Sequence, residues 1–560
     1  MAHKNNMLNQ SFLLTKTARI LLPLLVSLIS FLAYLNVFHH QFVFDDFRVI
    51  TNNPYIKDWK YFSALFNRDY FKISGELSYR PLVTLSYFID YSIWGLNPFG
   101  FHLTNLLIHT LNTFIAYLLI FKITKNLNLT VISCLFFGIH PILTETVNSV
   151  GFREDLLCAT FFLLALFFYV KHYTSKYKKI CYVASLLAYF FSLLSKEMAI
   201  SLPLIIFFLD LFFPQAETYL KKKIIRYYLG FICMSIAYIL LRLVFFKSTI
   251  EHVAYPGNSL ATNFLTMTKV IASYVKLWFF PVILNPDYHV TFEITFTKLP
   301  FLLSVALLIC IVVITLRLYK KEREITFSIL WAFITLIPVM NIIPLGNIMA
   351  ERYLYIPSLG FCMFLGMLIL KIPTLIQVSR TIIPVCLIVV LSPYFIHTIK
   401  HNRIWSNEQT LWTRTVYNTS CSFNAHNNLG KEYFQKGLVD KAIEEYTIAL
   451  SKASEVQYKY PTAHYNLGVA YDEKGMYEAS IREYKNALRI DPKNGDAHNN
   501  LAITFFKNGQ VDMAIEEFRA AITQDPNNPT YHDNLAKLYY RINMPGEAKT
   551  EQELANRLKH

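Results

Sequence analysis

The sequence predicts an all-α protein in which a polytopic membrane domain of about eleven transmembrane helices precedes an α-solenoid. Two observations lead to this fold class. Hydrophobic residues make up 54% of the chain and charged residues only 16%, against about 25% charged in a typical soluble protein. Beyond about residue 422 the composition turns polar and a helical-repeat pattern appears. We therefore predict a membrane domain over 1–400, a membrane-proximal linker over 401–421 and a solenoid over 422–560.

Apolar runs of about 18–20 residues, long enough to span a bilayer, define the membrane domain. We place the spans at 19–38, 99–121, 128–146, 155–171, 180–195, 198–214, 227–246, 299–317, 325–344, 352–371 and 381–400. Two further apolar stretches, 81–94 and 264–284, would break the alternation of sides, so we expect interfacial or re-entrant helices there. The first span has no small-residue cleavage site after it, and we expect it to stay uncleaved.

Basic clusters fall between alternate spans, all on the side of the N-terminus. They are Lys122 with Lys125, Lys171 to Lys179, Lys221–Lys223 with Arg226, Arg317 to Arg323, and Lys371 with Arg380. By the positive-inside rule this side is the cytoplasm. The net charge of +15 is thus explained by loops that face anionic lipid, and it does not indicate nucleic-acid binding.

The same count places the ionisable residues that are hardest to explain at the outer ends of the spans. These are Asp45, Asp46, Arg80, His140, Glu145, Arg153, Glu154, Lys196, Glu197, Asp287, Glu351 and Arg352. Ordinary helix-end polarity would scatter such residues over both faces. Ionisable groups at the membrane are costly and usually functional, so the pattern favours an outward-facing site.

Phe42-Val43-Phe44-Asp45-Asp46 follows directly on the first span. Two adjacent carboxylates raise each other's pKa, which suits a general base, although a solvated acidic loop would read the same way. Structural alternatives exist for the other positions as well. Arg80 could bind headgroup phosphates, His140-Pro141 could mark a kink, Arg153 could start a helix, and Lys196-Glu197 and Glu351-Arg352 could be structural ion pairs.

The polar region repeats a short motif at a spacing of about 34 residues. The motif reads Asn428-Leu429-Gly430, Asn466-Leu467-Gly468, Asn500-Leu501-Ala502 and Asn534-Leu535-Ala536. This period is the tetratricopeptide pattern, and we expect about four helix pairs and a polar capping helix from Gly546. Stacked pairs form a solenoid with a concave binding face. Trp405 and Trp412, just past the last span, are expected to sit at the headgroup level as an anchor.

The chain has no phosphate-binding glycine loop, nucleophile elbow or HExxH zinc motif. A site built from carboxylates and cations at the membrane surface fits glycosyl transfer from a lipid-linked donor. A carboxylate would take the proton of an acceptor hydroxyl, and arginine or lysine would hold the departing phosphate. We expect no cofactor and no catalytic metal.

Several motifs in the same order resemble the transmembrane O-mannosyltransferases that carry tetratricopeptide repeats, and their bacterial relatives. Besides the Asp45-Asp46 motif they are Ser78-Tyr79-Arg80-Pro81-Leu82, the stretch from Gly95 to His102, His140-Pro141 with Glu145, Ser195-Lys196-Glu197, the stretch from Glu351 to Ser358, and Trp405. This resemblance implies a GT-C fold, a polyprenyl-phosphate sugar as donor with mannose as the expected sugar, and Asp45 or Asp46 as the base. It makes Arg80, Lys196 and Arg352 the candidates for binding the donor phosphate. His102, His140, Glu145, Arg153, Glu197 and Glu351 complete the candidate donor-binding set.

The chain departs from these relatives at three points. Related protein O-mannosyltransferases carry an Asp-Glu pair where this chain has Asp45-Asp46. The repeat-bearing relatives usually read Gly-Arg where it has Gly151-Phe152-Arg153. Its repeats are also fewer.

The function expected from the sequence is transfer of a sugar to Ser or Thr hydroxyls of exported proteins, with the solenoid presenting the acceptor. Transfer to a glycan or lipid, or a non-catalytic membrane-anchored scaffold, are the alternatives. We expect a bacterial inner-membrane protein with its site and solenoid on the periplasmic side, because no retrieval signal ends the chain. The alternative is the endoplasmic reticulum membrane with a lumenal site.

Overall fold

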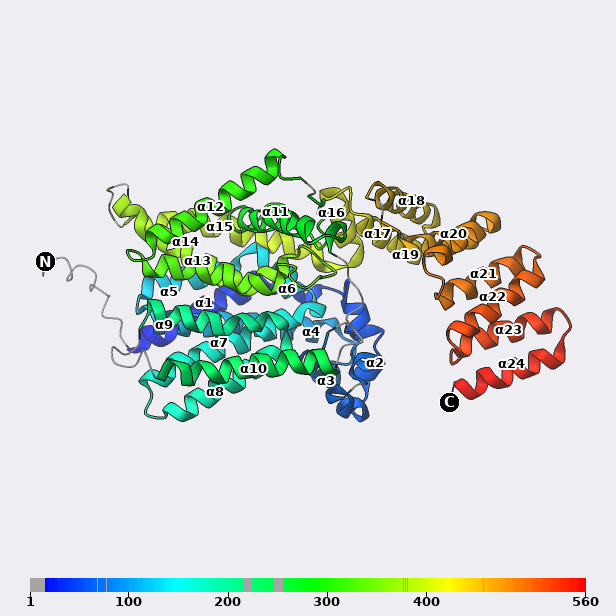
Figure 1. Cartoon of the computed structure of the whole chain (residues 1–560), viewed down its shortest axis with the longest axis horizontal. Helices are drawn as coiled ribbons and strands as arrows, with labels where there is room; N and C mark the ends of the chain where they lie inside the picture. The colour runs from blue at the N-terminus through cyan, green and yellow to red at the C-terminus, as the bar shows by residue number, and fades with distance from the viewer. Residues whose placement is uncertain are drawn as a thin grey trace, which may run out of the picture. The chain divides into compact units, whose positions relative to one another are not determined.

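The computed structural model describes residues 16–67, 69–76, 78–214, 223–245, 255–293, 295–375, 377, 379, 381–456 and 458–559. Lys221, Lys222 and Arg380 of the basic clusters lie outside these residues. The chain divides into two compact units, Met1–Thr410 and Leu411–His560 (Figure 1). Both are helical, and no β-strand occurs among the described residues. The predicted all-α fold class, a helical membrane domain followed by helical repeats, is confirmed.

Every predicted span coincides with a helix or a helix interrupted by a short break. In order, the helices are α1 (Lys16–Ala33), α4 (Pro98–Thr124), α5 with α6 (Leu127–Ile139 and Thr144–Asn148), α7 (Arg153–Thr174), α8 (Lys178–Ser195), α9 (Leu202–Phe212), α10 (Lys223–Phe245), α12 (Leu299–Leu318), α13 (Arg323–Leu336), α14 (Tyr355–Leu375) and α15 (Ile382–Asn402). Figure 1 shows the long helices of this unit running along a common direction.

By length and composition alone, six of the described helices could cross a membrane, or seven if a pair bent by 49° at His140 counts as one span. This number is below the expected eleven because several apolar runs are interrupted before they reach full length. A break at Lys196-Glu197 precedes α9, and a short 3₁₀ turn, Ile337–Val339, ends α13. The helix lengths and composition are those of a multi-pass membrane protein.

The two stretches predicted to be interfacial or re-entrant are helices α3 (Pro81–Trp94) and α11 (Leu260–Phe279). Neither meets the criteria for a membrane span. The chain between α1 and α3 contains short helical turns and α2 (Tyr70–Ser74), and it has a hydrophobic core of its own. Phe42, Ile50, Tyr70 and Val83 belong to that core. The segment that follows the first span is therefore a packed structure.

The two tryptophans past the last span are buried, with side chains 0% exposed at Trp405 and 1% at Trp412. The prediction that they anchor the chain at the headgroup level is wrong, because a buried indole cannot contact lipid. Residues 401–421 are largely helical, with α15 ending at Asn402 and α16 covering Glu408–Asn418. The apolar surface of these rings stabilises the protein interior instead.

The second unit consists of four antiparallel helix pairs. They are α17 and α18 (Phe423–Gln435, Val439–Glu455), α19 and α20 (Pro461–Glu473, Tyr477–Ile490), α21 and α22 (Gly495–Lys507, Val511–Gln524), and α23 and α24 (Pro529–Arg541, Pro545–Leu558). The repeated motif has a small residue where an aromatic ring of the second helix packs. A Cβ atom on Gly468 would lie 2.8 Å from the Tyr484 ring, so a larger residue at this position would clash with the ring.

A histidine of each first helix binds a glutamate of the second, at a constant separation in sequence. The pairs are His426–Glu445, His464–Glu483, His498–Glu517 and His532–Glu551, with Nδ1–Oε2 distances of 2.6, 2.7, 2.6 and 2.6 Å. At His498 the other ring nitrogen, Nε2, lies 3.2 Å from the carbonyl oxygen of Pro492. Because both nitrogens face acceptors, both hydrogen bonds form only when the imidazole is protonated.

The hydrogen bond to Glu517 raises the pKa of His498 above its ordinary value of 6.5. A raised folded-state pKa gives stability that is fully present below the unfolded pKa and is lost as pH rises through the folded pKa. We therefore expect amide exchange in α21 and α22, corrected for the intrinsic chemical rate, to become less protected between pH 6 and pH 8. His498→Gln should lower protection at pH 6 and remove this decline. An unchanged decline in the variant would assign it to other groups.

Candidate functional site

The segment that carries the two adjacent aspartates is held in an unusual backbone conformation. Phe44, directly before them, has a φ of +56°, a left-handed conformation that is uncommon for a side chain of this size. Its backbone N–H donates to the side chain of Glu408 in α16. Strained residues of this kind persist where the surrounding structure holds them and often occur at functional sites. The two aspartates that follow Phe44 differ in exposure, with Asp45 partly exposed and Asp46 buried.

Asp46 points into the protein and is 0% exposed. Its Oδ2 accepts a hydrogen bond of 3.0 Å from the backbone N–H of Val43. Its Oδ1 accepts bonds from the Ser149 hydroxyl at 3.1 Å and from the Gly151 N–H at 2.6 Å. The carboxylate therefore fastens the loop after α1 to the turn before α7.

Burial raises the pKa of Asp46 to about 7, although the hydrogen bonds from Val43, Gly151 and Ser149 oppose the shift. The negative charge of Asp45 raises it slightly further. Asp46 thus holds its proton through the acidic range. Asp46 has no exposed surface, so a substrate hydroxyl cannot reach it unless the loop opens.

Asp45 points away from this contact, and 34% of its side chain is exposed. Its only ion pair among the described residues is with Arg48, at 3.8 Å. Gly151 packs so closely on Asp45 that a Cβ there would lie 3.1 Å from the Asp45 Cβ atom. Asp45 is therefore packed against Gly151 on its backbone side, while its carboxylate is partly exposed.

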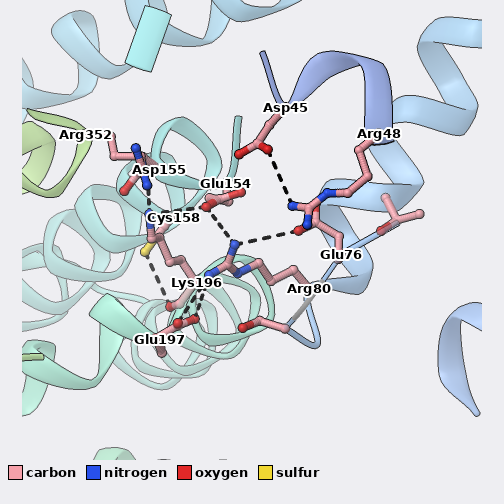
Figure 2. Close-up of polar contacts among 12 residues, drawn as sticks. Asp45, Arg48, Glu76, Arg80, Glu154, Asp155, Cys158, Lys196, Glu197 and Arg352 are labelled. Atoms are coloured by element: carbon pink, nitrogen blue, oxygen red, sulfur yellow. Dashed lines mark hydrogen bonds and ion pairs between the residues drawn. The ribbon is translucent and has the colours of Figure 1, made fainter. Parts of the chain in front are cut away.

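Beside Asp45, charged residues from three segments form a continuous network, which Figure 2 shows. Arg80 Nη1 lies 2.7 Å from Glu154 Oε1, and its Nη2 lies 3.2 Å from Glu197 Oε1. Lys196 Nζ lies 3.3 Å from Glu154 Oε1 and 2.6 Å from Asp155 Oδ2. The residue before α3, the first turn of α7 and the break between α8 and α9 thus meet through their side chains.

A second pair joins α6 to the turn before α14. Arg352 Nη1 lies 2.6 Å from Glu145 Oε1, and the Arg352 backbone N–H donates to Glu145 Oε2 at 2.7 Å. The Arg352 guanidinium also lies 4.2 Å from the centre of the Phe152 ring. The Tyr353 ring is within 5.5 Å of both the Lys196 ammonium and the Arg352 guanidinium, which brings this pair next to the network.

Glu351 turns the other way from Arg352. Its Oε1 accepts hydrogen bonds from the Tyr288 hydroxyl at 2.6 Å and from the Asn285 backbone N–H at 2.5 Å. Its side chain is 1% exposed. Glu351 therefore connects the site to the chain that follows α11.

Three predicted site residues make their polar contacts outside the network. Arg153 is 0% exposed and pairs with Asp90 at 2.6 Å. His102 Nε2 lies 3.3 Å from the Gln41 carbonyl oxygen. His140 accepts from the Ile142 N–H at 3.2 Å and so caps the turn that bends the α5–α6 pair. His140 thus lies at a bend and Arg153 at the start of α7, as two of the structural alternatives describe, although both side chains are buried.

The network also contains residues that the sequence did not single out. Arg48 is 46% exposed beside Asp45, Glu76 lies 3.7 Å from Arg80, and Arg242 lies 3.6 Å from Glu197. Burial and the charge of Glu154 raise the pKa of Glu76 to about 8, against the attraction of Arg80. A lone arginine near the end of the apolar helix α10 was the available signal for Arg242. Among the described residues, no group of three His, Cys, Asp or Glu side chains is placed to hold a metal ion; the expected absence of a metal stays a prediction.

The chain is similar to known proteins in both units. A family model described as TPR repeat matches residues 430–475, 472–509 and 504–543. A protein O-mannosyl-transferase of Caenorhabditis elegans is 28% identical over 459 residues, covering 77% of this chain and 62% of the relative. Protein O-mannosyl-transferase TMTC1 of Homo sapiens is 25% identical, covering 75% and 54%. Protein O-mannosyl-transferase TMTC3 of Mus musculus is 24% identical, covering 76% of this chain and 50% of the relative.

These matches confirm the family resemblance. The second unit is a tetratricopeptide array, and the chain is similar to the transmembrane and tetratricopeptide-repeat O-mannosyltransferases over about three quarters of its length. It spans between half and about three fifths of the length of these relatives. Among solved structures, a crystal structure of MamA is 21% identical with a TM-score of 0.25, over 27% of this chain and 85% of that one.

Gly151→Ala should disturb the site through the contact behind Asp45. The new Cβ would lie 3.1 Å from the Asp45 Cβ and 3.3 Å from the Asp46 nitrogen, and backbone atoms cannot rotate away. We expect a loss of about 1–3 kcal/mol in the free energy of unfolding, as for other overpacked sites. Thermal unfolding of the detergent-solubilised chain measures it. Gly346→Ala is the matched control, because no atom lies within 4 Å of its Cβ position, and equal stability of the two variants would contradict the packing.

Asp46→Asn should change how stability depends on pH. The folded-state pKa of about 7 is above the ordinary 3.8, so Asp46 stabilises the folded protein at low pH and this contribution disappears as pH rises through 7. The unfolding temperature of the wild type should therefore fall between pH 4 and pH 7 by a component that Asp46→Asn lacks. Asp45→Asn, at the exposed neighbour, should retain it. Parallel pH profiles for all three proteins would refute the assignment.

Proposed function

We propose that this chain is an integral membrane glycosyltransferase that moves a sugar, with mannose expected, from a polyprenyl phosphate to a Ser or Thr hydroxyl of a polypeptide. The observation that carries the proposal is Asp45, a partly exposed carboxylate held against a buried network of arginines, lysine and carboxylates. The relatives named protein O-mannosyl-transferase support the class of reaction. The apolar helices support a donor whose tail lies in lipid.

The reaction would be a single displacement with inversion at the anomeric carbon. The acceptor oxygen attacks that carbon while the Asp45 carboxylate takes the hydroxyl proton. The bond from the anomeric carbon to the phosphate oxygen breaks, and its electron pair leaves with the polyprenyl phosphate. No nucleotide takes part.

The structure favours Asp45 over Asp46 as the base, a choice that the sequence leaves open. Asp46 already accepts three hydrogen bonds and has no exposed surface. Asp45 has free acceptor surface and one distant cation partner. We therefore assign Asp46 a positioning role, in which it fixes the loop that presents Asp45.

Arg80, Lys196 and Arg352 each hold a carboxylate at 2.6–2.7 Å. Replacing such a partner with a substrate phosphate would leave a buried carboxylate unpaired, which is strongly unfavourable. We propose that these cations shape the site around the sugar while they keep their carboxylate partners. Their charges also stabilise the negative charge that develops on the leaving phosphate.

The solenoid offers regular binding groups for an acceptor polypeptide. Carboxamides of successive first helices connect neighbouring repeats, with Asn466 donating to Asn427 at 2.9 Å and Asn534 donating to Asn499 at 2.9 Å. A carboxamide carries one acceptor and two donors, which match the groups of an extended peptide backbone. A surface of this kind would bind polypeptides with little dependence on their side chains.

We place the site on the outer side of the bacterial inner membrane, facing the periplasm, on the distribution of basic loops in the sequence. The lumenal side of an endoplasmic reticulum membrane is the alternative. Transfer to a glycan or lipid would use the same membrane site and a different acceptor.

The test is transfer of radiolabelled mannose from polyprenyl-phosphate mannose in membranes that contain the wild type, Asp45→Asn or Asp46→Asn, with product separated into protein and lipid fractions. Asp45→Asn should lower labelling of protein about 100-fold or more at equal protein level, since general-base catalysis contributes about 10²–10⁴-fold. Asp46→Asn should act mainly through a lower amount of folded protein. Asp58→Asn, an exposed carboxylate in the same segment, serves as control.

Label in lipid or glycan would keep the enzyme and change its acceptor. Full activity of Asp45→Asn would remove this residue as the base. Loss of activity only in Asp46→Asn, with its protein folded, would transfer the role to Asp46. No label from any polyprenyl-linked sugar would favour the non-catalytic scaffold.

A further inference from the structure

A cavity of about 500 Å³ opens beside α11, outside the charged network. Its volume is in the usual range for a small-molecule site. Lys269, Ser273 and Lys276 line it from one face of α11. The chain after the helix contributes Phe280, Val282, Ile283 and the run from Tyr288 to Thr291. All the residues that line it belong to the described part of the first unit.

The cavity has a cationic side. Lys276 is exposed, and it makes no ion pair with any residue that the structure describes. Lys269 lies 3.2 Å from Glu293, a carboxylate that also binds Lys298 at 3.3 Å. Two lysines thus share the Glu293 carboxylate while Lys276 has no anionic partner among the described residues, and His289 lines the same space. The surplus of positive charge suits an anionic ligand.

The other side of the opening is apolar. Phe280, Val282 and Ile283 line the cavity and have exposed fractions of 66%, 69% and 58%. In water such a patch would be unfavourable, whereas next to a bilayer it would contact acyl or prenyl chains. A ligand that fits both sides has an anionic head and a long apolar tail.

Two residues that line the cavity connect it to the segment that carries Glu351 and Arg352. The Tyr288 hydroxyl donates a hydrogen bond of 2.6 Å to Glu351. Met349, which also lines the cavity, precedes Arg352 by three residues in the sequence. Arg352 packs on Phe152, the neighbour of the Gly151 that supports Asp45. A ligand seated here would therefore lie beside the segment that carries Glu351 and Arg352.

We propose that this cavity binds the phosphate of a polyprenyl-phosphate ligand, with Lys276 as its main cation and Lys269 as its second, and with Phe280, Val282 and Ile283 receiving the first prenyl units. This assignment rests on the proposed function for the identity of the lipid. It explains how the chain holds a phosphate while the cations of the network keep their carboxylates. Lysine serves such a site as a compact point charge on a flexible stem.

The test measures binding of radiolabelled polyprenyl monophosphate, which carries no sugar, to the full chain in nanodiscs of phosphatidylcholine. The neutral polyprenol with the same tail is the reference ligand. We expect the wild type to prefer the phosphate, and Lys276→Gln to weaken its binding about tenfold while leaving polyprenol binding unchanged. Lys276→Arg should bind nearly as the wild type does, because it keeps the charge. Lys320→Gln, an exposed lysine in a predicted cytoplasmic loop, should change nothing.

The proposal is overturned if Lys276→Gln and Lys269→Gln both discriminate phosphate from polyprenol as the wild type does, or if the wild type does not discriminate. Equal competition by phosphatidylglycerol would also overturn it, since the cavity would then be a general phospholipid site. Parallel mannose-transfer assays separate the two proposals. A wild type that binds through Lys276 but transfers no sugar refutes the proposed function alone, whereas unimpaired binding and transfer by Lys276→Gln refutes this cavity alone.

Discussion

The geometry of the candidate site depends on one buried carboxylate. Asp46 bonds to the backbone of its own loop at Val43 and to the turn at Ser149 and Gly151, and these contacts set where Asp45 can lie. Gly151 leaves space for the Asp45 backbone to approach, so the two halves of the contact are complementary in shape as well as in hydrogen bonding. One aspartate of the pair thus acts as framework, which frees its neighbour to face outward.

The charged network around this contact has a structural role, because its cations are already paired with carboxylates and are not free to bind a substrate. Removing an ion from water costs several kcal/mol, and a buried ion pair recovers this only with good geometry. The short distances from Arg80 to Glu154, Lys196 to Asp155 and Arg352 to Glu145 meet that condition. These charged residues lie at helix ends or at breaks in the apolar helices, such as the break between α8 and α9 at Lys196. The helix breaks therefore occur where the charged residues meet.

The sequence was sufficient for the fold class, for a helix at each predicted apolar span and for the repeat, because hydrophobic length and a fixed period are local signals. It also selected most of the residues that meet in the network. It could not separate Asp45 from Asp46, since burial depends on Ser149 and Gly151 more than a hundred residues away. It misplaced Trp405 at the lipid surface, because an indole after an apolar span has the same local pattern whether it is buried or interfacial. It missed Arg48, Glu76 and Arg242, whose roles follow only from their neighbours in space.

The contacts that shape the loop after α1 also set an order of assembly. The loop emerges early in synthesis, yet its Asp46 needs Gly151 and its Phe44 N–H needs Glu408. Chains are made from the N-terminus, and domains form as their parts become available. The loop therefore reaches its final conformation only after the last membrane helix, α15, has been made. A chain that stops before α16 would contain every charged residue of the network and still lack the contact that holds Phe44, so newly made protein stays unfinished at this site until its membrane domain is complete.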